Sequence, residues 1–434
     1  MQLADNMTLY NDYLSISGVS VQALKEKYGS PLYIIDQKGF EDRVKLFQNH
    51  FKSEKFNTRI IYASKAFLCT YLSKLINQLN LAIDVVSGGE LYTALNGGIN
   101  PEQIYFHGNN KLLSELTYAL EKGVGTIVVD NWTEYQTIQS LAKKPVRVLL
   151  RVNPGIEAHT HEYIQTAKHS SKFGLAIDDS KTNQLIQAMA ADPLIDFAGL
   201  HCHIGSQVFE EKSFFKEAQV MISYASQIQS QLNLRVKELN LGGGFGVYYT
   251  DQDKPFEYKD FLKNYIRVVE KTIDKEGLDL DIVSIEPGRS LINDFGTTIY
   301  DIGIIKPMPN YQDFIFIDGG MGDNPRPSLY GANYEAAIDG KITQKPYQTY
   351  SIAGKCCESS DVLIKRIDLP QAVPHDTLVV PRTGSYTYSM SSNYNKIPRP
   401  AVVFVKDGQD LLVIERESYE DLLRNEVTTN ENIL

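Results

Sequence analysis

The stretch RIIYASKAF (59–67) decides the fold, because it joins a short apolar run to a turn that carries Lys65. Similar apolar runs recur along the chain, separated by longer segments of helical period, a pattern typical of parallel strands buried between helices. The expected strands span residues 59–63, 82–86, 103–106, 126–129, 146–152, 196–201, 238–241 and 282–285. Eight strand-helix units in about 230 residues favour a closed (β/α)₈ barrel over a doubly wound sheet.

The second half of the chain follows a different pattern. The expected helices between the barrel strands span 70–79, 114–122, 134–143, 182–190, 214–232 and 261–275. After residue 290, short apolar runs bounded by Gly, Pro and Asn predict strands at 298–305, 314–317, 378–380 and 401–405. Residues before 36 hold only a candidate helix (21–27) and a strand (32–35). We therefore expect an α/β protein with a barrel at 36–290 and an all-β domain formed by 1–35 together with 291–434.

Length and charge limit the classes of function. The 434 residues exceed the roughly 250 to 300 at which single cores stop growing, so two domains are expected. A net charge of −10 without a dense basic block argues against nucleic acid or a membrane as partner. The first residues do not resemble a signal peptide, and no apolar run approaches the ~20 residues of a transmembrane helix. The cytosol is the expected compartment.

The cysteines do not form a recognisable framework. Cys69, Cys202, Cys356 and Cys357 are too few for a disulfide scaffold, and their spacing fits no zinc site. We expect reduced thiols, of which at most one takes part in chemistry.

Active sites of (β/α)₈ barrels lie at the carboxyl ends of the strands, so the residues directly after each apolar run are the candidates. Lys65 follows the first strand. A lysine at a strand end is often only a solvated surface residue. Among apolar and aromatic neighbours at a barrel mouth, however, its amine becomes a nucleophile for an aldehyde cofactor.

Glycines and histidines follow two later strands. The run LGGGFG (241–246) lacks the spacing of both common nucleotide-binding fingerprints, and it suits either a flexible turn or a backbone nest for a phosphate. His201 and His203 lie two apart and face the same side of a strand. That spacing would suit a metal pair, but no third ligand stands out, and a histidine stacked on a flat cofactor explains the pair equally well.

The last barrel strand ends in EPGR (286–289). Glu286 and Arg289 can form a structural ion pair. A more specific interpretation is that the carboxylate faces a pyridine nitrogen and keeps it protonated, which makes pyridoxal phosphate an electron sink.

Taken together, these motifs make the chain resemble the alanine-racemase-fold decarboxylases that use pyridoxal 5′-phosphate, most closely the diaminopimelate decarboxylase family. The resemblance covers nearly the whole length. It rests on YASKAF (62–67), DVVSGGEL (84–91), RVNPGIEAHTHEY (151–163), SKFG (171–174), GLHCHIGSQ (199–207), NLGGGFG (240–246), EPGR (286–289), DGGMGDNPRPSLYGA (318–332), CES (357–359) and SYTYSMSSNYN (385–395).

The resemblance implies roles around the cofactor. Lys65 resembles the Schiff-base lysine, Asp84 lies beside it, and His203 resembles the histidine stacked on the pyridine face. Glu286 resembles the partner of the pyridine nitrogen. The residues that resemble the phosphate grip are Ser206, Gly244, Glu286, Pro287, Gly288, Arg289 and Tyr386.

The resemblance also implies the substrate, meso-2,6-diaminopimelate, which has a second amino-carboxylate far from the reacting carbon. Its matching contacts are Arg289, Arg326, Tyr330, Glu358 and Tyr386. Guanidinium groups suit the distal carboxylate, and Glu358 suits the distal amine. Cys357 resembles the catalytic cysteine that crosses a head-to-tail interface and protonates the carbanion, so a homodimer with shared active sites is implied.

Some positions depart from the family pattern. Ser385 stands where Gly-Ala-Tyr is common, Ser360 where Cys-Glu-Ser-Gly-Asp is common, and Gln165-Thr166-Ala167 replaces Ser-Thr-Gly. None removes a reacting group.

Two other functions compete with this interpretation. A related decarboxylase could act on ornithine, arginine or carboxynorspermidine, but such diamine decarboxylases usually carry Asp, in place of Glu358, after the cysteine. A silent regulatory relative would not need Lys65, His203, Glu286 and Cys357.

Overall fold

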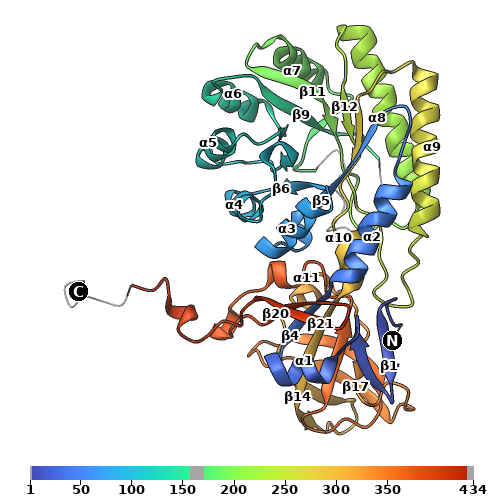
Figure 1. Ribbon diagram of the computed structural model, residues 1–434, viewed down its shortest axis with the longest axis vertical. Coiled ribbons are helices and arrows are strands. Elements are labelled where there is room, and N and C mark those ends of the chain that lie inside the picture. Colours follow the sequence, from blue (N-terminus) through green and yellow to red (C-terminus); the bar gives the residue numbers. More distant parts are fainter. Residues whose placement is uncertain (1, 157–170, 428–434) are drawn as a thin grey trace. The chain divides into compact units, whose positions relative to one another are not determined.

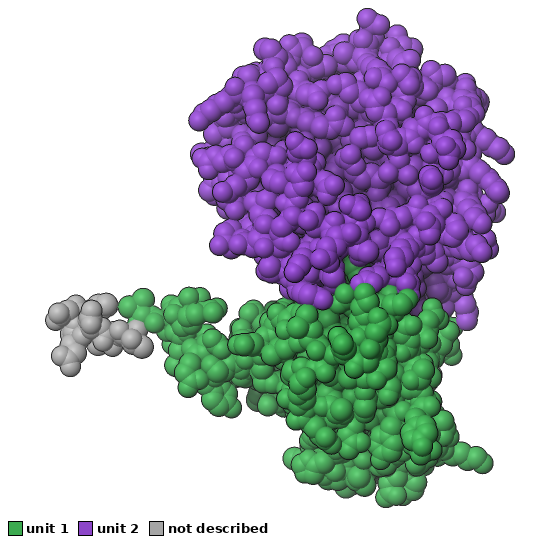
Figure 2. Space-filling view, viewed as in Figure 1, with its two compact units in different colours: residues 1–40, 249–252, 292–434 green, residues 41–248, 253–291 purple. Residues whose placement is uncertain are grey.

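The computed structural model describes residues 2–156 and 171–427. The chain divides into two compact units, which Figure 2 colours separately. Unit 1 comprises residues 1–40, 249–252 and 292–434, and unit 2 comprises 41–248 and 253–291. The domain boundaries at 36 and 290 expected from the sequence stay a prediction.

Unit 2 is a closed barrel of eight parallel strands (Figure 1). Each strand pairs with the next, and the last pairs with the first, where Ile285 lies opposite Ile60. This confirms the expected fold class and all of the expected barrel strands. The strands are β5 (Asn57–Ala63), β6 (Ala82–Val85), β7 (Ile104–Phe106), β8 (Thr126–Val129), β9 (Val146–Asn153), β11 (Ile195–His201), β12 (Glu238–Asn240) and β13 (Ile282–Ile285).

Side chains fill the barrel, and helices surround it. The interior contains a cluster of residues from six strands: Ile61, Ala82, Tyr105, Val128, Leu149 and Ala198. The helices are α2 (Gln37–His50), α3 (Thr70–Gln78), α4 (Gly88–Asn96), α5 (Leu113–Lys122), α6 (Trp132–Leu141), α7 (Ser180–Ala191), α8 (Glu211–Leu232), α9 (Tyr258–Glu276) and α10 (Arg289–Ile292). The six expected helices are confirmed. The sequence did not predict α4, which starts with two glycines but is capped by Ser87, whose hydroxyl accepts a bond from the Glu90 amide.

Unit 1 is mostly β-sheet, as expected. Its main sheet has the order β18 (Val362–Leu369), β17 (Gln348–Ala353), β15 (Asp313–Ile317), β14 (Gly296–Lys306), β4 (Leu32–Asp36), β20 (Ala401–Lys406) and β21 (Gln409–Ile414). The strand β19 (Thr377–Pro381) pairs with β14 and with β16 (Ala337–Ile338). The short helix α11 (Arg326–Tyr330) also belongs to this unit, whereas the two-residue strand β10 (Leu175–Ala176) pairs with β9 in the barrel.

The N-terminal segment packs on this sheet. It forms β1 (Met7–Tyr10), β2 (Tyr13–Ile16), β3 (Val19–Ser20) and the expected helix α1 (Val21–Tyr28). Leu14 and Leu24 of this segment share a buried apolar cluster with Leu32, Ile299 and Val403. The three strands were not predicted, because such short runs with mixed exposure resemble turns. No helix of the described chain combines the length and apolar character needed to cross a membrane.

Helix α8 carries a buried carboxyl group away from the strand ends. Glu217 of α8 is fully buried, and the Cys202 thiol donates a hydrogen bond to its Oε1 at 3.0 Å. Its Oε2 has no hydrogen-bond partner among the described residues. Burial therefore raises the pKa of Glu217 from 4.5 to about 8.

This carboxyl group should make stability depend on pH. Between pH 4.5 and about 8 the folded protein holds a proton on Glu217 that the unfolded chain has released, so stability falls as pH rises through this window. In the unmodified protein, the free energy of unfolding should fall by up to about 5 kcal/mol between pH 4.5 and about 8 because of Glu217, and Glu217→Gln should abolish this fall. Unfolding free energies at several pH values test this. Glu211→Gln, at the partly exposed start of α8, is the control and should leave the dependence unchanged; equal curves for all three proteins would contradict the assignment.

Candidate active site

Lys65 lies in a short 3₁₀ turn, Ser64–Ala66, directly after β5, and its side chain is exposed. The turn is tied to the next strand, because the Ser64 amide donates to Oδ1 of Asp84 at 3.1 Å. Asp84 is buried. Burial, and then the negative charge of Glu286, hold the pKa of Asp84 well above its usual value, and the cation of Lys65 opposes this. The expected proximity of Lys65 and Asp84 is therefore present.

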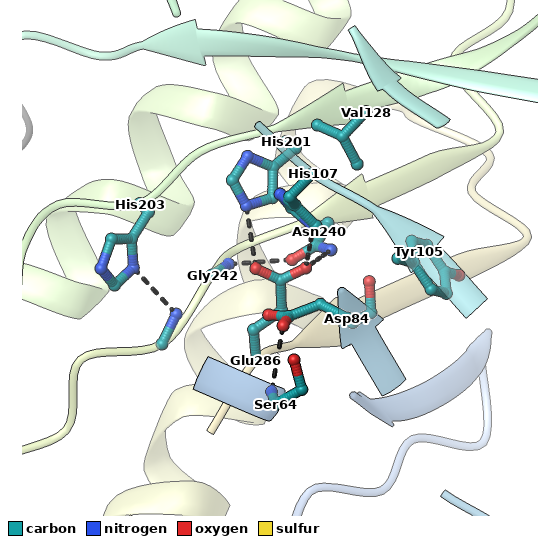
Figure 3. A network of polar contacts seen from close by, with 12 residues as sticks. Ser64, Asp84, Tyr105, His107, Val128, His201, His203, Asn240, Gly242 and Glu286 are labelled. Carbon is teal, nitrogen blue, oxygen red and sulfur yellow. Dashed lines mark hydrogen bonds and ion pairs between the residues drawn. The ribbon is translucent and has the colours of Figure 1, made fainter. Parts of the chain in front are cut away.

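Glu286, directly after β13, is held by polar groups from three other strand ends (Figure 3). Its Oε1 contacts Nε2 of His107 at 2.8 Å and accepts a bond from Nδ2 of Asn240 at 2.7 Å. Its Oε2 lies 3.0 Å from Nε2 of His201. Burial alone would raise the pKa of Glu286, but the contacts with the two histidines lower it well below the usual range. Glu286 is therefore a charged acceptor at neutral pH.

The turn that follows Glu286 packs against the end of β5. The carbonyl of Pro287 accepts a bond from the Ala63 amide at 3.2 Å. A Cβ on Gly288 would lie 2.8 Å from the Cβ of Ala63, so only glycine fits this approach. Barrel closure thus sets Glu286 beside the turn that carries Lys65.

The glycine run after β12 is packed tightly. A Cβ on Gly243 would lie 2.1 Å from the carbonyl oxygen of Glu286. A Cβ on Gly244, where φ is +103°, would lie 1.8 Å from the carbonyl oxygen of Gly205. Neighbouring backbone encloses the loop at these two positions, which favours a fixed nest over a flexible turn. The Gly243 amide also donates to Nδ1 of His203 at 3.2 Å, which fixes that imidazole ring.

The loop after β11 is joined to the turn after β13. Nη2 of Arg289 donates to the Ser206 hydroxyl at 3.3 Å. The residues expected to grip a phosphate, Ser206, Gly244 and the 286–289 turn, thus come from three neighbouring strand ends. Their role in holding a phosphate stays a proposal.

The other expected site residues lie in unit 1. Arg326 is buried, with its guanidinium carbon 4.4 Å from the ring centroid of Tyr249, and its Nη1 donates to the Tyr334 hydroxyl at 2.6 Å. Tyr330, on the same short helix, is 48% exposed. Arg326 is therefore fixed by the protein, whereas Tyr330 is accessible.

Cys357 and Glu358 lie on an exposed loop. The Cys357 amide donates to Oδ1 of Asn395 at 2.8 Å, and the Tyr394 hydroxyl donates to Oε2 of Glu358 at 3.4 Å. The SSNYN segment of the family pattern thus supports this loop. All four cysteines are free thiols, as expected.

Ser385, one of the departures from the family pattern, is fully buried and donates to Oδ1 of Asn293 at 2.6 Å. The same oxygen accepts a bond from the Tyr249 hydroxyl at 2.8 Å. Ser385 is thereby connected to the ring that packs on Arg326, and it directly precedes Tyr386, whose φ is +58°.

Ser360, another departure, lies on the loop of Cys357 and Glu358, and its amide donates to Oε1 of Glu358 at 3.4 Å. The carbonyl of Ser360 accepts a bond from the Ser328 hydroxyl at 2.7 Å. Gln165, Thr166 and Ala167 lie outside the described residues, as does part of the motif at 151–163.

Sequence analysis missed two of the groups around Glu286. His107 directly follows β7, so the rule that found Lys65 would have found it too. Asn240 is the last residue of β12 and was quoted only as part of the glycine motif. The structure does not support a metal site formed by His201 and His203. His201 contacts Glu286, whereas His203 accepts a hydrogen bond from the Gly243 amide.

Comparisons with known proteins give the family of the chain. The family model "Pyridoxal-dependent decarboxylase, pyridoxal binding domain" matches residues 37–293. A diaminopimelate decarboxylase of Bacillus subtilis is 45% identical over 415 residues, which cover 95% of this chain and 94% of that protein. The chain belongs to the diaminopimelate decarboxylase family.

Solved structures of this family have the same fold. A diaminopimelate decarboxylase from M. jannaschii in complex with L-lysine matches with a TM-score of 0.91 and 29% identity, covering 98% of both chains. Another from Helicobacter pylori, also with L-lysine, gives a TM-score of 0.83 and 29% identity over 93% of this chain and 98% of that chain. The expected family, enzyme class and pyridoxal phosphate cofactor are confirmed, and the glycine cradle and the Glu286 acceptor fit that cofactor.

The glycine run offers a direct test of the cofactor cradle. We expect Gly244→Ala to lower the affinity for pyridoxal phosphate by about tenfold or more, since the added methyl group would force the loop away from Gly205. Titration of the apoprotein by absorbance measures this. Gly277→Ala is the matched control, because Gly277 also has a positive φ but open space around it. It should lose about 1 kcal/mol of stability and no affinity; unchanged affinity in Gly244→Ala would contradict the cradle.

Proposed function

We propose that this chain removes the carboxylate of the D-centre of meso-2,6-diaminopimelate and releases L-lysine and carbon dioxide, the last step of lysine biosynthesis. The observation that carries the proposal is a charged, fixed Glu286 beside the turn of Lys65. When bound, pyridoxal phosphate supplies an electron sink for the electrons of the broken bond. Lys65 would hold the cofactor covalently, and Glu286 would keep a proton at its ring nitrogen.

The other barrel residues orient the cofactor and its phosphate. His203, fixed by the Gly243 amide, offers a flat ring. Its pKa lies well below the usual value, because burial and then the cation of Lys65 disfavour the charged form. A neutral imidazole can stack on a pyridine ring without adding a charge. Ser206, Gly244 and Arg289, together with Tyr386, would hold the phosphate group.

The substrate proposal rests on Arg326. Its guanidinium is buried against aromatic rings, which leaves a rigid set of donors suited to a carboxylate. Glu358 would meet the distal amine, and Arg289, Tyr330 and Tyr386 complete the proposed substrate contacts. Ornithine and arginine have no distal carboxylate, so they offer Arg326 no partner.

Substrate contrast tests this assignment. We expect Arg326→Ala to lower kcat/KM for meso-diaminopimelate by roughly 30-fold or more, since a desolvated charged contact contributes about 2–5 kcal/mol. Slow turnover of ornithine or lysine should change little. Tyr334→Phe, which removes only the hydroxyl that contacts Arg326, should have a smaller effect. Release of carbon dioxide is the readout for every substrate, with lysine release as a second readout for meso-diaminopimelate. Equal losses with all substrates, or faster turnover of ornithine by the unmodified protein, would disprove the substrate.

We further propose a homodimer with shared sites, in which Cys357 serves as the proton donor to the carbanion in the partner's site. The exposure of Cys357 supports this role. A cytosolic location also stays a proposal, supported by four free thiols, the state that a reducing compartment maintains.

Mixing inactive variants tests the shared site. Cys357→Ala should lower kcat far more than it raises KM, because a proton donor acts after substrate binding. Lys65→Ala should abolish turnover. Random mixed dimers of the two variants should recover about a quarter of the unmodified activity, because one site in each mixed dimer is complete. No recovery in verified mixed dimers would mean that each chain builds its own site.

A further inference from the structure

The groups around Glu286 use most of its hydrogen-bonding capacity. A carboxylate offers about four lone-pair positions. Oε1 is filled by His107 and Asn240, and Oε2 is contacted by His201. One position, on Oε2, is left for a further donor.

Both histidines direct Nε2 at the carboxylate, and their protonation decides what the cluster does. An imidazolium would neutralise Glu286, whereas a neutral imidazole with its proton on Nε2 leaves the charge in place. Burial, the largest influence, lowers the pKa of His201 to about 4 and also lowers that of His107, although the charge and the hydrogen bond of Glu286 act in the opposite direction on both. Nδ1 of His201 is buried without a hydrogen-bond partner in the described chain, so a proton there would be unsatisfied.

The two imidazoles also fix each other. Their ring centroids are 4.7 Å apart with an interplanar angle of 72°, an edge-to-face contact. His107 directly follows β7 and His201 is the last residue of β11, and both are buried. Figure 3 shows them on the same side of the Glu286 carboxylate. Neither ring can turn away from Glu286 without disturbing the other.

We propose that His107 and His201 are positioning residues: neutral, each donating its Nε2 proton, they keep Glu286 charged and leave one acceptor position for the N–H of the cofactor ring. The inference rests on the proposed function, because it assigns Glu286 to the pyridine nitrogen. This role explains why the buried Glu286 is surrounded by neutral donors. A cationic partner would neutralise the negative charge of Glu286, and that charge is what would keep the ring nitrogen protonated.

A metal ion is the competing explanation. His107, His201 and Glu286 offer three ligand atoms within 4.8 Å of one another. A metal at both Nε2 atoms would displace the protons that now face the carboxylate. The amide of Asn240 is a donor aimed at Oε1 and would not serve as a ligand. The cluster therefore suits hydrogen bonding better than coordination.

Other charges also act on the cluster. Asp84 and Glu286 repel each other, which favours protonated Asp84 over loss of the Glu286 charge. Arg151 of β9 is a partly buried cation that disfavours protonation of both histidines. Lys65 acts directly on Asp84 and His203. These charges support neutral histidines beside a charged Glu286.

The test measures the protonation of the cofactor ring directly. The holoenzyme is loaded with pyridoxal phosphate labelled with ¹⁵N in the ring, and the ¹⁵N shift is compared among variants. His107→Leu and His201→Leu should each move the signal toward the unprotonated ring, and the double variant should move it further. His201→Gln, which keeps a donor, should restore it partly. Cys202→Ser is the control, since Cys202 is equally buried on the same strand end but contacts Glu217.

Activity gives a second readout. Each leucine variant should lower kcat by about tenfold or more, because Glu286 loses a donor that orients it, and KM should change less. If the double variant binds cofactor and its ring stays protonated, the inference is wrong. It is also wrong if the unmodified protein holds one zinc ion per chain that His107→Leu removes.

A measurement on the unmodified holoenzyme avoids variants that fail to fold. With ¹⁵N-labelled histidine, both rings should be neutral with the proton on Nε2 at pH 7. A doubly protonated ring, or a proton on Nδ1, would overturn the inference. Normal lysine release by the same sample would then leave the proposed function standing.

Discussion

The pairing of β13 with β5 is the constraint on which the site depends. It closes the barrel, with Ile285 opposite Ile60, and it brings the turn after β13 against the end of β5 through the bond from Ala63 to Pro287. If the β13–β5 pairing were absent, β5 and β13 would be the two edge strands of an open sheet. Lys65 and Glu286 would then lie at opposite edges of that sheet. Closure makes them neighbours, and Gly288 allows the close approach that this requires.

A second constraint is the cost of a buried charge. Glu286 is 8% exposed, so its negative charge must be stabilised by the protein itself. Three donors at the ends of β7, β11 and β12 stabilise this charge, and they also fix the direction of the carboxylate. Gly243, after β12, lets the two backbones approach closely at the main-chain carbonyl of Glu286. The carboxylate proposed as the acceptor for a ring nitrogen is therefore already oriented by the chain, which is how preorganised sites reduce the cost of catalysis.

The barrel could be predicted from the sequence, because few folds other than a (β/α)₈ barrel accommodate eight apolar runs that alternate with helices at regular spacing. Lys65 and Glu286 were found because each directly follows a strand. The partners of Glu286 were not found, because a contact between His107 and Glu286 depends on barrel closure and on side-chain direction. His201 stayed ambiguous for the same reason. The α4 helix was missed because its two starting glycines hid a side-chain cap at Ser87.

The central claim is that this barrel holds pyridoxal phosphate on Lys65 beside Glu286. Reduction of the holoenzyme with borohydride, followed by digestion and peptide mass spectrometry, tests it most directly. The account predicts loss of the visible absorbance of the bound cofactor and a pyridoxyl group on the peptide that contains Lys65. A pyridoxyl group on another lysine, such as the buried Lys111, or no labelled peptide at all, would contradict it.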